Sequence, residues 1–179
     1  MLDLLNRIGK ALLAGIFIGC ASCANASAPD RTVGALVFSF GIILVMLIGA
    51  DLFTGKVGKL VLKEPFTELI FGMGIMLPFN LFGCWLVKEL SGIEFAPVAQ
   101  VSFLKAMITG IMVICAVNSK QLLGAVAAIF FFVIIGCPHC IACIGQVGLE
   151  DWCVVALGNI VGAVAMEGLL WLKSEKNSS

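Results

Sequence analysis

The chain has 179 residues, of which 61% are hydrophobic and only 12% are charged. An average soluble domain has about 45–50% apolar and about 25% charged residues, so this composition excludes an ordinary water-soluble domain and indicates a membrane protein. Eleven basic and eleven acidic residues give no formal net charge, which excludes the broad basic surface typical of nucleic-acid-binding proteins.

Six segments approach the length of about 20 mostly apolar residues that a membrane-spanning helix needs. In chain order they are residues 4–21, 32–49, 69–87, 101–117, 122–136 and 152–172. Residues 1–28 also resemble a secretory signal peptide, because Arg7 and Lys10 precede an apolar run with small residues at its end. We expect this segment to form the first span instead, and residues 1–179 to form a single all-α transmembrane domain.

The second and the fifth segments are both interrupted. Each is short and continues through a glycine-containing polar stretch, over residues 49–55 in one case and 136–140 in the other, into a further apolar run. Irregular backbone at membrane depth persists only where protein or a water-filled cavity satisfies its amide groups. Two interrupted helices at corresponding positions in two halves therefore predict a transport site.

A short internal repeat accompanies the two interruptions. Residues 80–83 in the third segment and 159–162 in the sixth both read Asn, two apolar residues, Gly, and each follows the interrupted segment of its half. Chance is the alternative explanation for so short a match. We interpret it as a repeat of about 1–90 and 91–179, in which three spans per half require the second copy to be inverted.

The basic residues set the predicted orientation. With both termini in the cytoplasm, eight basic residues lie inside and three lie outside, namely Arg31, Lys88 and Lys105. The inside set consists of Arg7, Lys10, Lys56, Lys59, Lys63, Lys120, Lys173 and Lys176. This asymmetry satisfies the positive-inside rule and predicts a multi-pass protein of the inner cell membrane.

Asp51 is the charged residue of the first interruption. It precedes the run 52–62, so we expect its carboxylate to be the N-cap of a short helix, accepting hydrogen bonds from the first free amides. Direct contact with a transported molecule is the alternative. Phe53 is expected to point into the pathway or to seal the loop, and the Thr54 hydroxyl can donate to an anion unless it only bonds its own helix.

Residues 38–55 read Phe-Ser-Phe-Gly-Ile-Ile-Leu-Val-Met-Leu-Ile-Gly-Ala-Asp-Leu-Phe-Thr-Gly and resemble the second-span signature of the formate/nitrite transporter family. Residues 136–145 are similar to the fifth-span motif of that family, in which a histidine, here His139, follows a glycine by three residues. The resemblance implies an aquaporin-like protomer of six helices, assembled as a homopentamer with one pore per protomer. It also implies passage of small monovalent anions of weak acids, formate first and nitrite or hydrosulfide next. The sequence contains no nucleotide-binding motif, so neither a cofactor nor an enzymatic activity is expected.

The resemblance also implies site residues, position by position. One hydrophobic constriction would be formed by Phe38, Ile42 and Phe53, and Phe132 would contribute to the other. The polar groups near or between the constrictions would be Thr54, His139 and Asn159.

The chain departs from the family pattern around its histidine. Pro138 stands where the family usually has an acidic residue, and Cys140 and Cys143 stand where it usually has Ser and Asn. The vestibule lysine of the family has Lys105 as its nearest candidate, in a register that does not match well. These differences leave the choice among formate, nitrite and hydrosulfide open.

His139 is the only histidine of the chain and lies in a membrane interruption. Ionisable residues within membrane spans are usually functional, although a single histidine in a protein core is more often structural. An unpaired ion in a low-dielectric constriction faces a penalty of order tens of kcal/mol, and protonation removes most of it. Histidine can supply a proton near neutral pH, so we expect the permeant to cross wholly or partly as the neutral acid.

The cysteines support an alternative function. Cys20 and Cys23 form a Cys-x-x-Cys pair, and Cys137, Cys140 and Cys143 surround His139 with ligand-like spacing. Thiolates and imidazole suit a soft metal ion, and a Cys-x-x-Cys pair suits thiol redox chemistry. Small cysteines that let helices approach closely are the plainer interpretation.

Overall fold

The computed structural model describes residues 1–98, 100–119 and 121–176. The helices in chain order are α1 (Leu2–Ala26), α2 (Arg31–Ile48), α3 (Phe53–Leu62), α4 (Phe66–Phe71), the π-helical turn η1 (Gly72–Met76), α5 (Leu77–Ser91), α6 (Phe103–Asn118), α7 (Leu122–Ile134) and α8 (Leu149–Lys176). Lys120, one of the basic residues expected on the inner side, lies outside the described residues.

Four helical stretches are long and apolar enough to cross a membrane: Leu2–Ala26, Arg31–Ile48, Phe66–Ser91 and Leu149–Glu175. The 18 residues of α2 span about 27 Å at about 1.5 Å per residue, close to the hydrocarbon thickness of a bilayer. The 16 residues of α6 and the 13 of α7 are apolar but shorter. Large apolar side chains such as Phe40, Leu47 and Phe82 are about half exposed or more on the outside of the helices, as contact with lipid requires. The chain is an integral membrane protein.

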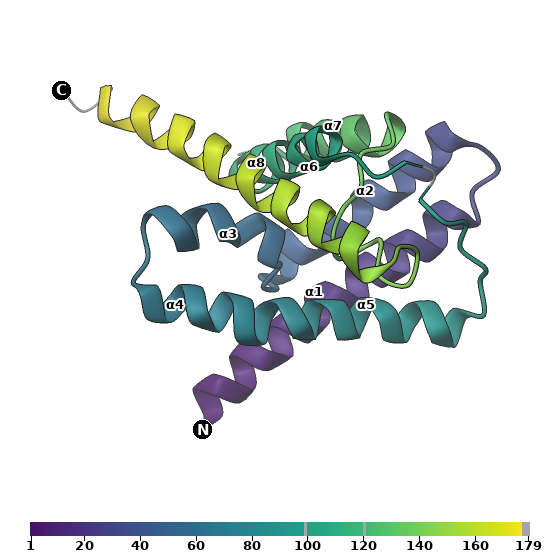
Figure 1. The fold of residues 1–179 in the computed structure, drawn as a ribbon, viewed down its shortest axis with the longest axis horizontal. Coiled ribbons are helices and arrows are strands. Elements are labelled where there is room, and N and C mark those ends of the chain that lie inside the picture. The colour runs from purple at the N-terminus through teal and green to yellow at the C-terminus, as the bar shows by residue number, and fades with distance from the viewer. Residues whose placement is uncertain (99, 120, 177–179) are drawn as a thin grey trace.

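The two halves of the chain pack in the same way. In the first half α1 contacts α2 and α5, and in the second half α6 contacts α7 and α8. The halves meet where α2 packs on α7 and α3 packs on α8. The start of α1 and the end of α8 lie toward the left of Figure 1, on the side of the turn between α3 and α4, whereas the α1–α2 and α5–α6 connections lie at the right.

Glycines at equivalent places let the helices of each half touch. A Cβ atom at Gly15 would lie 2.2 Å from the carbonyl oxygen of Asn80, and one at Gly110 would lie 2.1 Å from the carbonyl oxygen of Asn159. No side chain fits at either place, so α1 meets α5 and α6 meets α8 backbone against backbone. This close approach brings each asparagine within reach of the interruption in its own half.

The third span contains the π-helical turn that the sequence did not predict. In Figure 1 α4, η1 and α5 follow one another as a single rod, with the π turn over Gly72–Met76. Pro78 lies at the start of α5 and has no N–H to donate to the carbonyl of Gly74, four residues earlier. Directly before Pro78, the amide of Leu77 bonds the carbonyl of Gly72, five residues earlier, as in a π-helix.

The second half of the fifth span is not a helix, contrary to the expectation of an apolar helical run over 141–148. Residues 140–146 form successive turns, in which the amide of Cys143 bonds the carbonyl of His139 at 2.9 Å and the amide of Gln146 bonds that of Cys143 at 2.9 Å. Gly145 has a φ of 78°, which no right-handed helix contains, so helical backbone cannot continue to α8.

Candidate functional site

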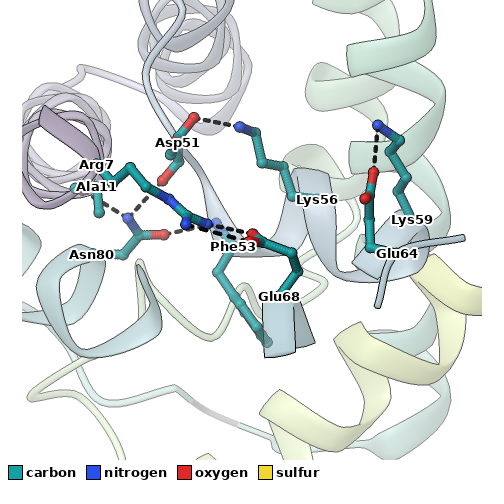
Figure 2. A network of polar contacts seen from close by, with 9 residues as sticks. All are labelled: Arg7, Ala11, Asp51, Phe53, Lys56, Lys59, Glu64, Glu68 and Asn80. Carbon is teal, nitrogen blue, oxygen red and sulfur yellow. Dashed lines mark hydrogen bonds and ion pairs between the residues drawn. The ribbon is translucent and has the colours of Figure 1, made fainter. Parts of the chain in front are cut away.

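The first interruption is held open by an asparagine from the third span. Helix α2 ends at Gly49, whose left-handed φ of 69° turns the chain, and α3 starts at Phe53. The Oδ1 atom of Asn80 accepts the amide of Phe53 at 2.7 Å. Its Nδ2 atom donates to the carbonyls of Asp51 at 2.9 Å and Ala11 at 2.7 Å. Asn80 therefore ties together α1, the interruption and α3 (Figure 2).

The side chain of Asp51 does not cap α3, so that prediction is wrong. The residue before α3 is Leu52, and no side-chain hydrogen bond caps the helix there. The carboxylate of Asp51 pairs with Lys56 on the next turn, as Figure 2 shows. The amide of Phe53 that a cap would have satisfied is already bonded to Asn80, so the carboxylate is free to turn toward a cation.

The second interruption repeats this geometry. Gly136, two residues after the end of α7, has a left-handed φ of 72°, similar to that of Gly49 directly after α2. The Oδ1 atom of Asn159 accepts the amide of Cys140 at 2.9 Å, and its Nδ2 atom donates to the carbonyls of Pro138 at 3.1 Å and Ala106 at 2.9 Å. Both amide hydrogens of Asn159 are thereby used by backbone carbonyls. In this structure Asn159 clamps the second interruption, and its role as a substrate-binding group stays a prediction.

The two interruptions meet at Thr54 and His139. The Oγ1 atom of Thr54 lies 2.9 Å from Nε2 of His139, and both residues are buried. Nδ1 of His139 accepts the amide of Ala142 at 3.3 Å, so we assign the ring hydrogen to Nε2, which donates to Thr54. The hydroxyl hydrogen of Thr54 is then available for another acceptor. The structure thus joins two of the three polar residues that the sequence suggested.

Aromatic rings lie against this pair. The ring of Phe132 stacks on His139 at 6.2 Å between centroids, and Phe38 meets the edge of Phe132 at 6.2 Å. Phe38 and Phe132 were assigned to different constrictions, yet here they form one aromatic group. Phe53 is fully buried elsewhere, with its ring 3.8 Å from the place of a Cβ at Gly72 in η1. That these residues and the fully buried Ile42 narrow a pathway stays a prediction.

A cavity of about 680 Å³ borders His139. Its lining includes Phe38, Phe132, Cys137 and His139. Its charged lining residues are Arg31, Lys105 and Glu94. Within residues 1–98, 100–119 and 121–176, neither of the two basic side chains forms an ion pair. The cavity therefore carries an excess of positive charge that suits an anion.

Arg31 is a lining residue that sequence reasoning placed outside but did not connect with His139. Its guanidinium lies over the second interruption, because a Cβ at Gly136 would be 2.6 Å from one of its terminal nitrogens. Helix α2 begins at Arg31, and the preceding Asp30 caps that helix through the amides of Thr32 and Val33. The sequence showed a basic residue at the start of a span, but only the fold shows that this span contacts α7.

Lys88 supports the segment that carries His139. It lies on α5 and is almost fully buried. Its Nζ atom donates to the carbonyls of Ala142 at 2.8 Å and Ile144 at 3.0 Å, and to the side-chain oxygen of Gln146 at 2.8 Å. The ammonium thus satisfies carbonyls that a helix over these residues would have paired internally.

Glu167 is the counterpart of Lys88 in the other half, because it follows Asn159 by as many residues as Lys88 follows Asn80. Its carboxylate bonds Nζ of Lys63 at 2.7 Å, at the C-terminal end of α3. Lys88 of the third span thus contacts the last part of the fifth span, and Glu167 of the sixth span contacts the last part of the second. The signs of the two charges are opposite.

The cysteines do not gather into a metal site in the described part of the chain. No group of three His, Cys, Asp or Glu side chains there is arranged to hold a metal ion. Cys20 and Cys23 lie on α1, Cys137 lines the cavity, and Cys140 and Cys143 are buried in the turns after it. All eight cysteines are free thiols.

No protein-family model matches the chain, and no curated protein matches it. A solved structure described as a pentameric formate channel with formate bound is similar to it. The TM-score is 0.72, at 22% sequence identity, over 96% of this chain and 97% of that one. At this level of identity the likeness shows the fold, so the chain has the fold of a membrane channel.

Proposed function

We propose that the protein is a passive or proton-linked channel for small monovalent anions of weak acids, with formate as the leading permeant and nitrite or hydrosulfide next. The observation that carries this proposal is the 2.9 Å contact of Thr54 with His139, which joins the two interruptions at a positively charged cavity. The likeness to a channel that binds formate supports it. The resemblance of residues 38–55 to formate/nitrite transporters points the same way.

The proposed architecture has six spans. They are α1, α2 continued by α3, α4 continued through η1 to α5, α6, α7 continued by residues 137–146, and α8. Matched contacts around Asn80 and Asn159 support two repeats of three spans each, and an odd number of spans inverts the second repeat, as in an aquaporin-like protomer. The similar solved channel is a pentamer, which supports a homopentamer here.

The proposed orientation places the cavity outside and both termini in the cytoplasm of a cell with an inner membrane. Lys56, Lys59 and Lys63 on and after α3 then lie on the inner side, as the positive-inside rule favours. Arg31 and Lys105 lie at the outer side. Figure 1 supports the common side of the start of α1, the end of α8 and the α3–α4 turn, since all three lie toward the left of the view.

The proposed mechanism begins with attraction of the anion into the cavity by Arg31 and Lys105. At the floor the anion meets His139 and Thr54, where the free hydroxyl hydrogen of Thr54 can be donated to it. Taking a proton there converts the anion into its neutral acid, which avoids the desolvation cost of a bare ion between the rings of Phe38 and Phe132. The proton comes from water, directly or through His139, and is released again on the other side.

Flux in proteoliposomes tests the proposal. Formate, nitrite and hydrosulfide should enter faster than into protein-free vesicles, with rates that rise as pH falls, whereas chloride should not follow them. His139→Phe should alter the pH profile, because the titrating ring is lost while an aromatic ring is kept. Equal formate and chloride flux would refute the weak-acid proposal, and an unchanged profile in His139→Phe would exclude proton transfer through this residue.

Purified protein tests the alternative. Metal analysis and a thiol count should give no stoichiometric metal and eight reactive thiols after unfolding, as eight free cysteines require. Stoichiometric metal or a reducible Cys20–Cys23 bond would favour the metal or redox function instead.

A further inference from the structure

Thr109 has an unusual buried hydroxyl. It lies on α6 and is completely buried. Among the buried side-chain nitrogen and oxygen atoms of the described residues, only its Oγ1 atom has no hydrogen-bond partner. Buried polar groups in folded proteins are nearly always paired, so an unpaired one needs a reason such as a water molecule or a ligand.

The other buried hydroxyls show what Thr109 could have done. Ser22 donates to the carbonyl of Ile18 at 2.8 Å, and Ser39 donates to that of Ala35 at 3.0 Å. Both use the carbonyl four residues earlier in their own helix, the usual solution for a hydroxyl in a membrane helix. Thr109 has the carbonyl of Lys105 at the same spacing and does not bond it. Its hydroxyl therefore lacks the bond within its own helix that Ser22 and Ser39 make.

The position of Thr109 along α6 places it on the course of the proposed pathway. Lys105, one helical turn earlier, lines the outer cavity. Val113, about one turn later, packs toward α3, since one of its methyl carbons lies 3.9 Å from the place of a Cβ at Gly55. Thr109 thus lies between the cavity and the residue next to Thr54.

The face of α6 supports the same placement. Ala106 and Val113 are three residues before and four residues after Thr109, so the three share one face of the helix. The carbonyl of Ala106 accepts Nδ2 of Asn159, which also holds the carbonyl of Pro138 beside His139. The Cβ atom of Ala106 lies 2.5 Å from the place of a Cβ at Gly158 on α8, so the face that carries Thr109 packs toward α8 at Ala106 and toward α3 at Val113.

We propose that the Thr109 hydroxyl hydrogen-bonds the permeating species, a small monovalent anion or its conjugate acid, below the outer cavity. This inference rests on the proposed channel function. A hydroxyl can donate to an anion and can also accept from the acid O–H, so one side chain serves both protonation states. Left without an acceptor in its own helix, the hydroxyl is available to each permeant and is released unchanged when it passes.

Thr109→Val tests the inference, because valine keeps the shape and the β-branch and removes only the hydroxyl. Formate flux in proteoliposomes should fall about tenfold, the usual effect of losing one hydrogen bond to a charged or strongly polar partner. The Tm in detergent should rise by about 2–4 °C, since an unpaired buried hydroxyl is removed. Thr109→Ser should keep the wild-type flux. Ser39→Ala, which removes a buried hydroxyl that is already bonded, is the matched control and should leave flux unchanged.

The combination of slower flux with higher stability distinguishes a ligand-binding hydroxyl from a structural one. If the wild-type protein conducts formate and the Thr109→Val variant conducts it equally fast, the role of Thr109 is overturned and the proposed channel function stays intact. A wild-type protein with no flux above empty vesicles would overturn both. If Thr109→Val does not assemble, Thr109→Ala against Thr109→Ser makes the same comparison, and equal flux in these two would also overturn the inference.

Discussion

Asn80 and Asn159 make the same set of hydrogen bonds in the two halves of the chain. Each accepts the amide that restarts the chain after an interruption, at 2.7 Å for Phe53 and 2.9 Å for Cys140. Each also donates to two carbonyls. One lies two residues before the bonded amide, and the other belongs to the first helix of the same half. One side chain per half thus satisfies irregular backbone that has no access to water at membrane depth.

Replacement of either asparagine by leucine should therefore destabilise the protein strongly. Asn80→Leu leaves the amide of Phe53 and the carbonyls of Asp51 and Ala11 without this partner, and each unpaired buried group costs about 1–3 kcal/mol. Thermal unfolding in detergent should show a Tm lower by about 5 °C or more, at about 2–4 °C per kcal/mol for a chain of this size.

Asn118→Ala is the control for these substitutions. Among the described residues, the side chain of Asn118 bonds only the carbonyl of Ile114 in its own helix, at 3.0 Å, so its loss should change the Tm little. An Asn80→Leu protein that unfolds at the same temperature as Asn118→Ala would contradict the clamp. Asn159→Leu should behave like Asn80→Leu, since its bonds are equivalent.

The positions of both interruptions could be predicted from the sequence, but their internal bonds could not. Gly49 directly after α2 and Gly136 two residues after α7 are both left-handed, as glycines in polar stretches suggest. Asp51 had the right spacing for an N-cap, yet the amide of Phe53 is taken by Asn80, which is 27 residues farther along the chain. Local spacing shows which groups can pair nearby and cannot show a competitor that packing brings from another span.

The same limit explains the other errors. A helix after His139 was expected because residues 141–148 are apolar, but Gly145 turns the backbone and Lys88 takes carbonyls that a helix would use. Arg31 looked like an ordinary basic residue at the end of a span, and only the packing of α2 on α7 places it over Gly136. By contrast, the motifs suggested both Thr54 and His139, and the fold brings them into contact; their part in a pore stays a prediction.

The Thr54–His139 contact predicts different effects for two substitutions of Thr54. Thr54→Val removes the acceptor for Nε2–H and the hydroxyl that can donate to the permeant, so formate flux at pH 7 should fall about tenfold or more. Thr54→Ser keeps both functions of the hydroxyl and should retain most of the flux. Stopped-flow measurement on proteoliposomes compares the two variants at equal protein content. Equal flux in the valine and serine variants would show that this hydroxyl has no part in permeation.

Lys88 is predicted to be a positioning residue for the His139 segment. Lys88→Met should keep much of the buried volume but leave the carbonyls of Ala142 and Ile144 unpaired, at a cost of about 1–3 kcal/mol each. Amide hydrogen exchange over residues 140–148 should become faster, while exchange in α1 should stay as in wild type. Lys88→Arg should restore part of the protection, because it keeps the positive charge and several donors.

Lys173→Met is the control for this experiment, since it removes an exposed lysine near the C-terminal end of α8. A purely surface role for Lys88 would make the two methionine variants alike. Faster exchange throughout the protein in Lys88→Met would show general destabilisation instead of local release of the segment, and would refute the positioning role.

Arg31 and Lys105 are predicted to raise the concentration of anions in the cavity by electrostatic attraction. Neither forms an ion pair within residues 1–98, 100–119 and 121–176, so their charge is expressed in the cavity, against the single carboxylate of Glu94. Arg31→Gln and Lys105→Gln should each lower formate flux about threefold at about 10 mM salt, and less at about 0.5 M, because salt screens such attraction. Glu94→Gln should act in the opposite direction.

Lys173→Gln, which changes the net charge equally but away from the cavity, should have little effect at either salt concentration. Flux losses that do not depend on salt would mean that these residues act by direct contact or by supporting the fold, since long-range attraction must weaken as the screening length shortens from about 30 Å to a few Å.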